Sequence, residues 1–155
     1  MMPRKYRIVV LPGDGIGAEV VSEALKVLRA AQEVTAGLEL EFQEFECGAH
    51  YWLKTGGREE WSPEAFQACR EATAVLFGAV GLPDAVKPDG TMVGTDVIFG
   101  LRFGLDLYAN VRPVKLYPGV GCPIVGKKPG DIDFVIIREN TEGLYSPIRG
   151  ALTRG

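Results

Sequence analysis

The sequence predicts an α/β protein built on an open, mostly parallel β-sheet. Segments with strand and helix character alternate through the first half of the chain, and a glycine-rich stretch directly follows both the first and the third predicted strand. The carboxyl ends of parallel strands meet at one edge of a sheet, and open α/β sheets bind ligands at that edge. These two glycine-rich stretches therefore mark the expected site.

The first three elements follow from hydrophobic patterning. Residues 6–11 form a mainly apolar run, which predicts a buried strand. From Val20 onward apolar residues recur at helical spacing, until Gly37 ends the helix. Residues 38–43 alternate between apolar and polar side chains, as in a strand with one solvated face. The chain therefore opens with a β-α-β unit.

A second helix and a third strand extend this pattern. Ser62 is expected to cap the helix, with Pro63 at its first position and Glu64 near the positive end of its dipole. The helix ends near Ala72, and the apolar strand at 74–77 runs into a glycine-rich loop. Beyond that loop we expect a loop rich in Gly, Pro and Asp at 82–94, a helix at 97–105, a strand at 106–113, a turn-rich segment at 117–130 and a strand at 134–137.

Composition excludes several classes of protein. The chain has 155 residues, of which 46% are hydrophobic and 24% charged, as in a soluble domain with its own core. A formal net charge of -3 gives no general attraction to nucleic acid or to an anionic membrane, and no segment is long and apolar enough to span a membrane. The three cysteines are widely spaced and odd in number, which indicates neither a disulfide framework nor a zinc knuckle and favours the cytoplasm. The single histidine, His50, is interpreted as a satisfied polar residue beside Tyr51 and Trp52 rather than a catalytic one.

The loop after the first strand matches the residue spacing of a dinucleotide-binding motif. Gly13, Gly15 and Ala18 match G-x-G-x-x-[GA]. However, Asp14 and Glu19 add carboxylates where a bound pyrophosphate needs the positive end of the helix dipole. An ordinary Rossmann fingerprint and a plain strand-to-helix turn are both possible interpretations, and the sequence favours a third, a different and specific loop.

Three arginines occupy positions typical of a binding site. Arg102 lies on a predicted helix, Arg112 ends an apolar strand before a proline, and Arg138 ends the last predicted strand. A guanidinium is a rigid fork that fits a carboxylate, so three arginines around one cavity would hold a substrate with two or more carboxylates. The alternative is three ordinary salt bridges to acidic residues of the chain.

Four motifs in order carry a family resemblance: LPGDGIGAEV, LFGAVG, LRFGLDLYANVRPVKL and DFVIIRENTEGLY. They resemble the β-decarboxylating dehydrogenases, the family of isopropylmalate, isocitrate, homoisocitrate and tartrate/D-malate dehydrogenases. The resemblance implies a sheet of the isopropylmalate dehydrogenase type rather than an ordinary Rossmann domain. It also implies that residues 1–105 are the amino-terminal part of a first α/β domain and 106–155 the start of a second domain for dimerisation and substrate binding, with the remainder of the enzyme missing.

The resemblance further implies a cytoplasmic homodimer that oxidises a (2R)-2-hydroxy acid at C2 with NAD and then removes its β-carboxylate as CO2. Arg102, Arg112 and Arg138 would clamp the small dicarboxylate substrate, and Tyr145 would be the catalytic acid that helps to protonate the enolate. The cofactor would contact Ile16, Gly78, Ala79, Val80 and Gly81. The Mg2+ or Mn2+ ligands and the lysine base of the family match nothing in this chain, so the chain alone is expected to be inactive.

The substrate is predicted from the helix turn before Arg102. Isocitrate enzymes resemble one another in placing Ser and Asn six and four residues before this arginine, where this chain has Asp96 and Ile98, with Phe99 next. An apolar side chain cannot bind a third carboxylate and Asp96 would repel it, which favours 3-isopropylmalate, the substrate in leucine biosynthesis. Tartrate or D-malate, isocitrate or homoisocitrate, and a non-catalytic regulatory subunit remain alternatives, as does NADP in place of NAD.

Overall fold

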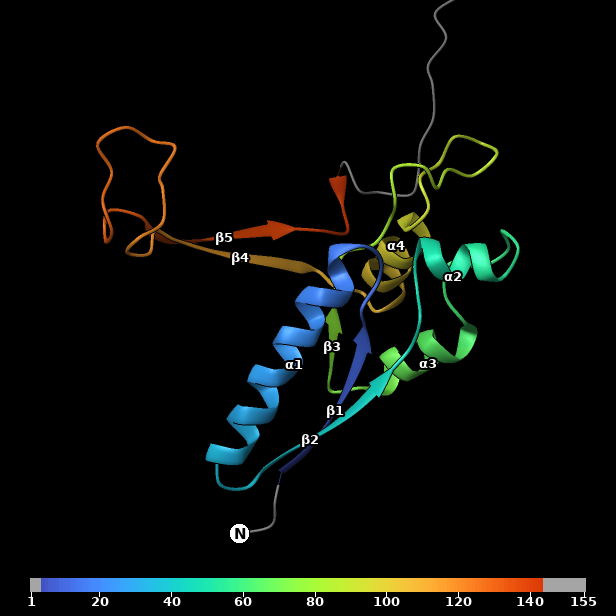
Figure 1. The fold of residues 1–155 in the computed structure, drawn as a ribbon, viewed down its shortest axis with the longest axis horizontal. Helices are drawn as coiled ribbons and strands as arrows, with labels where there is room; N and C mark the ends of the chain where they lie inside the picture. The colour runs from blue at the N-terminus through green and yellow to red at the C-terminus, as the bar shows by residue number, and fades with distance from the viewer. Residues whose placement is uncertain (1–3, 144–155) are drawn as a thin grey trace, which may run out of the picture. The chain divides into compact units, whose positions relative to one another are not determined.

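The computed structural model describes residues 4–143 and divides into two compact units, residues 1–101 and residues 102–155 (Figure 1). The first unit holds a parallel sheet and its helices, and the second holds a two-stranded antiparallel ribbon. Within residues 4–143, no helix has the length and apolar character needed to cross a membrane. The boundary that the resemblance implies between the two domains of the enzyme, after residue 105, stays a prediction.

The sheet of the first unit consists of β1 (Arg4–Leu11), β2 (Leu38–Glu44) and β3 (Ala74–Phe77). The strand order is β2-β1-β3 with both pairings parallel, and Val9 of β1 lies between Gln43 and Val75 in the register. The central strand ends in three buried residues, Val9, Val10 and Leu11. A strand covered on both faces needs such a continuous apolar run, so the predicted parallel α/β fold class is confirmed.

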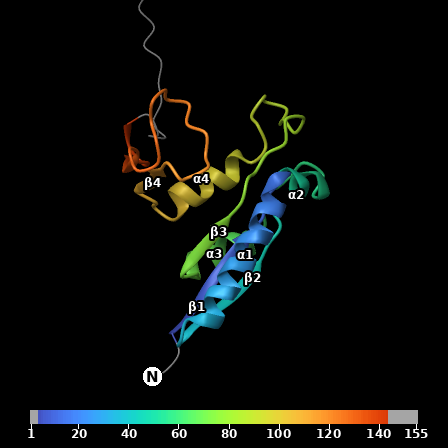
Figure 2. The same ribbon diagram turned by 60° about the vertical axis from the view of Figure 1, so that its left-hand side comes forward.

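Helices cover both faces of this sheet (Figures 1 and 2). The long helix α1 (Ile16–Val34) places Arg29 over the ring of Phe42 on β2, at 5.7 Å from its centroid. On the opposite face, Arg7 donates a 2.6 Å hydrogen bond to the carbonyl of Glu71 in α3 (Pro63–Glu71). Successive strand residues point to opposite faces, so the two helices pack on different sides of the sheet.

The start of α3 follows the predicted capping pattern. Ser62 is extended, its Oγ accepts a 3.2 Å hydrogen bond from the Ala65 amide, and Pro63 takes the first helical position. A short helix that the sequence did not predict, α2 (Ala49–Lys54), precedes it. Six residues are too few to display a helical hydrophobic period, and glycines flank this segment on both sides.

The segment predicted as a loop at 82–94 contains a small hairpin. The Val93 amide donates to the Ala85 carbonyl at 3.1 Å, and the Lys87 amide donates to the Thr91 carbonyl at 2.8 Å. Ala85 and Val93 are buried together with Ala49 of α2. The hairpin is therefore anchored on α2 by apolar contacts, which local sequence signals do not reveal.

Helix α4 (Thr95–Gly104) runs from the first unit into the second. It ends in a Schellman motif, in which Asp106 adopts a φ of 50° and the Leu107 amide donates to the Arg102 carbonyl at 2.8 Å. The antiparallel ribbon follows as β4 (Ala109–Lys115) and β5 (Asp133–Glu139), joined by the turn-rich segment that the sequence predicts.

Candidate functional site

The two glycine-rich loops pack directly against each other at the carboxyl edge of the sheet. The loop after β1 donates a 2.6 Å hydrogen bond from the Asp14 amide to the Ala79 carbonyl, in the loop after β3. A Cβ on Gly13 would lie 2.0 Å from that carbonyl oxygen, and a Cβ on Gly17 would lie 2.7 Å from the same oxygen. Only residues without side chains allow this approach, so the sequence-predicted cofactor loops form one surface.

Asp14 is the buried centre of this loop junction. The residue is 2% exposed. It accepts hydrogen bonds from the amides of Ala49 at 2.7 Å, His50 at 2.9 Å and Gly81 at 2.7 Å. The sequence suggested that this carboxylate would repel a pyrophosphate. It lies instead inside the protein, where it binds the amides at the start of α2. The loop therefore departs from the Rossmann fingerprint because Asp14 has a structural role.

His50 pairs with the same carboxylate. Its Nδ1 lies 3.0 Å from Asp14 Oδ1, while 65% of the imidazole side chain remains exposed. The interpretation of His50 as a satisfied polar residue therefore has a specific partner, Asp14, that the sequence did not indicate.

The buried cysteines of the first unit are poor nucleophiles. All three cysteines of the chain carry free thiols. Burial, with the negative charge of Asp14 as a smaller cause, raises the pKa of the Cys47 thiol to about 12, and burial raises the pKa of Cys69 to about 11. The thiolate is the reactive form, so neither residue suits covalent catalysis at neutral pH.

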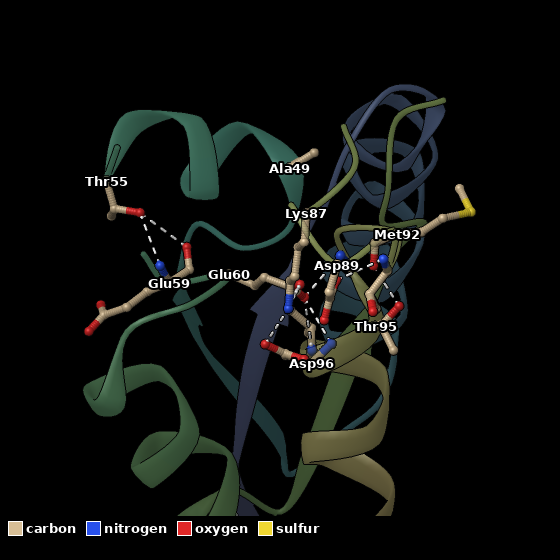
Figure 3. Close-up of polar contacts among 12 residues, drawn as sticks. Ala49, Thr55, Glu59, Glu60, Lys87, Asp89, Met92, Thr95 and Asp96 are labelled. Carbon is tan, nitrogen blue, oxygen red and sulfur yellow. Dashed lines mark hydrogen bonds and ion pairs between the residues drawn. The ribbon is translucent and has the colours of Figure 1, made fainter. Parts of the chain in front are cut away.

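A second buried carboxylate, Glu60, holds the start of α4 (Figure 3). Its Oε2 accepts hydrogen bonds from the amides of Gly94 and Asp96, both at 2.9 Å, and of Val97 at 3.3 Å. Sequence reasoning missed this residue. A glutamate in a charged, glycine-rich stretch is typical of the protein surface. Its hydrogen-bond partners lie 34 to 37 positions further on, where no local sequence signal indicates them.

Lys87 links Glu60 to Asp96. Its Nζ lies 2.8 Å from Glu60 Oε1, an ion pair by distance whose angles fall outside those of a hydrogen bond, and 2.6 Å from Asp96 Oδ2. Burial lowers the pKa of Lys87, but the hydrogen bond to Asp96 and the negative charges of Glu60 and Asp96 outweigh burial and raise it. The sequence treated Asp96 as a free negative charge near the substrate, and the structure shows this carboxylate paired with Lys87.

The residues predicted to select the substrate lie on α4 with the first arginine. Ile98 is half-buried and Phe99 is exposed. Arg102, which is half-buried, follows them by four and three positions. Residues at these spacings share one face of a helix, so α4 presents an apolar pair next to a guanidinium.

The other two arginines lie on one face of the β4-β5 ribbon. Arg138 is opposite Asn110 and Arg112 is opposite Ile136, which places the two arginines at diagonal positions on the same side. Arg112 Nε donates to Asn110 Oδ1 at 2.8 Å, and Arg138 Nη2 donates to Asn140 Oδ1 at 3.1 Å. The register brings together Arg112 and Arg138, while Arg102 lies on a separate element. Sequence reasoning missed both asparagines.

Comparison with known proteins identifies the family of the chain. The profile of isocitrate/isopropylmalate dehydrogenases matches residues 7–154, essentially the whole chain. The chain belongs to this dehydrogenase family. The match includes both glycine-rich loops, α4 and the ribbon, so the resemblance drawn from the four motifs is confirmed.

Two curated relatives in the family are similar to the chain to nearly the same degree. It is 44% identical over 156 residues to 3-isopropylmalate dehydrogenase of Thermobifida fusca and 41% identical over 157 residues to decarboxylating D-malate dehydrogenase of Escherichia coli. These alignments cover 100% and 99% of the chain but 42% of each relative. The chain therefore spans less than half the length of these dehydrogenases.

A solved structure of the family has the same fold. Isocitrate dehydrogenase from Methylococcus capsulatus superimposes with a TM-score of 0.70 at 29% identity, over 92% of this chain and 37% of that one. The predicted fold class, a sheet of this dehydrogenase type, is thereby confirmed.

Metal ligands do not gather in the part of the family fold described here. Among residues 4–143, no group of three or more His, Cys, Asp or Glu side chains could hold a metal ion. The two most buried carboxylates, Asp14 and Glu60, are committed to backbone amides. Tyr145, the predicted proton donor, lies outside the described residues.

Proposed function

We propose that the chain is the amino-terminal part of an NAD-dependent, β-decarboxylating dehydrogenase that acts on 3-isopropylmalate. The observation that supports this most is the placement of Arg112 and Arg138 on one face of the β4-β5 ribbon. Two adjacent guanidinium groups suit a dicarboxylate, since each can bind one carboxylate through paired, charge-assisted hydrogen bonds. Arg102 completes the proposed clamp.

The substituent on the substrate is inferred from α4. Ile98 and Phe99 share a helix face with Arg102, which suits an alkyl group next to a carboxylate. The second candidate is D-malate or tartrate, which lacks this alkyl group. The 41% identity to the D-malate enzyme favours it almost as much as the 44% identity to the isopropylmalate enzyme favours the first.

The cofactor is proposed to bind at the carboxyl edge of the sheet. Ile16, 60% exposed at the start of α1, and the adjoining loop 78–81 would contact it. NAD, when bound there, accepts the hydride that leaves C2 of the substrate. The Mg2+ or Mn2+ ligands and the general base would come from the rest of the enzyme or from the second subunit of a homodimer, and Tyr145 stays the proposed proton donor.

The substrate class is tested by turnover in the protein that contains this chain. NAD reduction is measured at 340 nm with 3-isopropylmalate, D-malate, tartrate and isocitrate, each with Mn2+ or Mg2+. We expect the highest kcat/KM for 3-isopropylmalate. A preference for D-malate or tartrate would establish the second candidate, and no turnover with any acid would favour the regulatory-subunit alternative.

The arginine clamp is tested by Arg112→Lys. A lysine keeps the charge but loses the bidentate fork, so one charge-assisted hydrogen bond of roughly 1.5–3 kcal/mol is lost, about 10- to 100-fold in affinity. We expect KM for the acid to rise by this factor while the Kd of NAD stays within about twofold. The matched control is Arg70→Lys on the exposed surface of α3. Equal losses for acid and NAD would remove Arg112 from the clamp.

A further inference from the structure

We propose that Glu60 is a positioning residue for substrate selection, because it fixes the first turn of α4 and thereby the placement of Ile98 and Phe99. This inference rests on the proposed function, which assigns those two side chains to the substrate's alkyl group. Figure 3 shows Glu60 and Lys87 converging on the start of α4 near Asp96.

The first turn of α4 depends on Glu60 rather than on a local cap. The first amides of a helix have no partner within the helix and need an acceptor from elsewhere. Thr95 is the nearest local candidate, but its hydroxyl donates a 2.6 Å hydrogen bond to the Met92 carbonyl. Three amides at the helix start instead donate hydrogen bonds to one oxygen, Glu60 Oε2. The negative charge at this position also complements the helix dipole.

Lys87 makes the buried charge of Glu60 tolerable. Glu60 is 2% exposed, and a buried carboxylate without a compensating partner is strongly destabilising. Lys87 supplies that partner, with its side chain 19% exposed and 2.8 Å from Oε1. Its second contact, to Asp96, returns to the same helix turn. The first turn of α4 is therefore held in two ways: Glu60 binds its backbone amides, and Lys87 binds the Asp96 side chain.

The turn held in this way directly precedes the proposed selectivity residues. Val97 is fully buried and its amide donates the last of the three hydrogen bonds to Glu60, and Ile98 and Phe99 directly follow it. A small rotation of the turn would therefore move both apolar side chains of α4 away from the position that the proposed substrate requires. One methylene group in apolar surroundings is worth about 1–3 kcal/mol of discrimination, so displacement of Ile98 and Phe99 has a measurable cost.

The test compares Glu60→Gln with Glu59→Gln in the protein that contains this chain. The two glutamates are adjacent, and only Glu60 is buried. The readout is the ratio of kcat/KM for 3-isopropylmalate to that for D-malate, which differ only in the isopropyl group, at saturating NAD. Effects on cofactor binding or on the amount of folded enzyme cancel in this ratio. We expect it to fall about tenfold in Glu60→Gln, from the loss of about 1.4 kcal/mol of discrimination, and to stay unchanged in Glu59→Gln.

A second measurement distinguishes this inference from the proposed function. Wild-type protein that turns over neither acid would overturn both. Wild-type turnover with an unchanged ratio in folded Glu60→Gln would overturn only the role of Glu60. If Glu60→Gln does not fold, Asp96→Asn is the deciding variant. Asp96 is exposed, and its substitution weakens only the contact with Lys87. A smaller fall in the ratio, with faster hydrogen exchange at the amides of Gly94, Asp96 and Val97, supports the proposal, and an unchanged ratio overturns it.

Discussion

Gly13→Ala is expected to destabilise the protein far more than Gly37→Ala, although both glycines have nearly the same positive φ. Their φ angles are 76° and 78°, and a left-handed φ costs an L-residue roughly 1–2 kcal/mol. Around Gly37 an added Cβ meets nothing within 4 Å, whereas at Gly13 it would lie 2.0 Å from the Ala79 carbonyl oxygen. Overpacking of this kind adds about 1–3 kcal/mol or more.

The measurement is urea-induced unfolding followed by circular dichroism. The shared cost of positive φ and the shared effect of alanine on the unfolded chain cancel between the two variants, so the difference reports the contact between the loops after β1 and β3. We expect Gly13→Ala to lose at least about 1–3 kcal/mol more than Gly37→Ala. The same variant should weaken NAD binding, because Ala79 has to move. Coincident unfolding curves would contradict the close packing of the two loops.

Asp14→Ala is expected to lose about 3 kcal/mol or more of unfolding free energy, since it removes the acceptor of three amides that are buried or partly buried. The amides belong to Ala49, His50 and Gly81, so both the start of α2 and the second cofactor loop would lose their anchor. Asp14→Asn should be intermediate, because the amide side chain keeps one oxygen acceptor but not the charge.

The matched control is Asp84→Ala, the same substitution at an exposed aspartate in the segment after β3. Surface changes of this kind usually stay within about 0.5 kcal/mol. Thermal and urea unfolding of the three variants, together with NAD titration, would separate the anchoring role from a general effect of lost charge. Similar losses in Asp14→Ala and Asp84→Ala would show that the buried contacts contribute little.

Local sequence patterns were sufficient for the parallel sheet and for one helix start. Residues 74–77 and 38–43 show the two different strand patterns, and the Ser62-Pro63 pair marks the start of α3, because these signals depend on neighbours in the chain. They were insufficient for α2, which is shorter than two helical turns, and for the hairpin within 82–94, which depends on apolar contact with α2. Elements of this size owe their stability to tertiary packing.

The sequence by itself determined the fold class, the family and the candidate residues, because periodicity and motif spacing are properties of the chain. Only the tertiary structure decided how charged groups are paired. Asp14 was expected to repel a pyrophosphate and is buried against the start of α2. Asp96 was expected to repel a third carboxylate and pairs with Lys87, and Glu60 was not among the expected residues. A buried carboxylate is stable only where amides and cations from distant segments converge on it, and the fold, not the local sequence, brings those partners together.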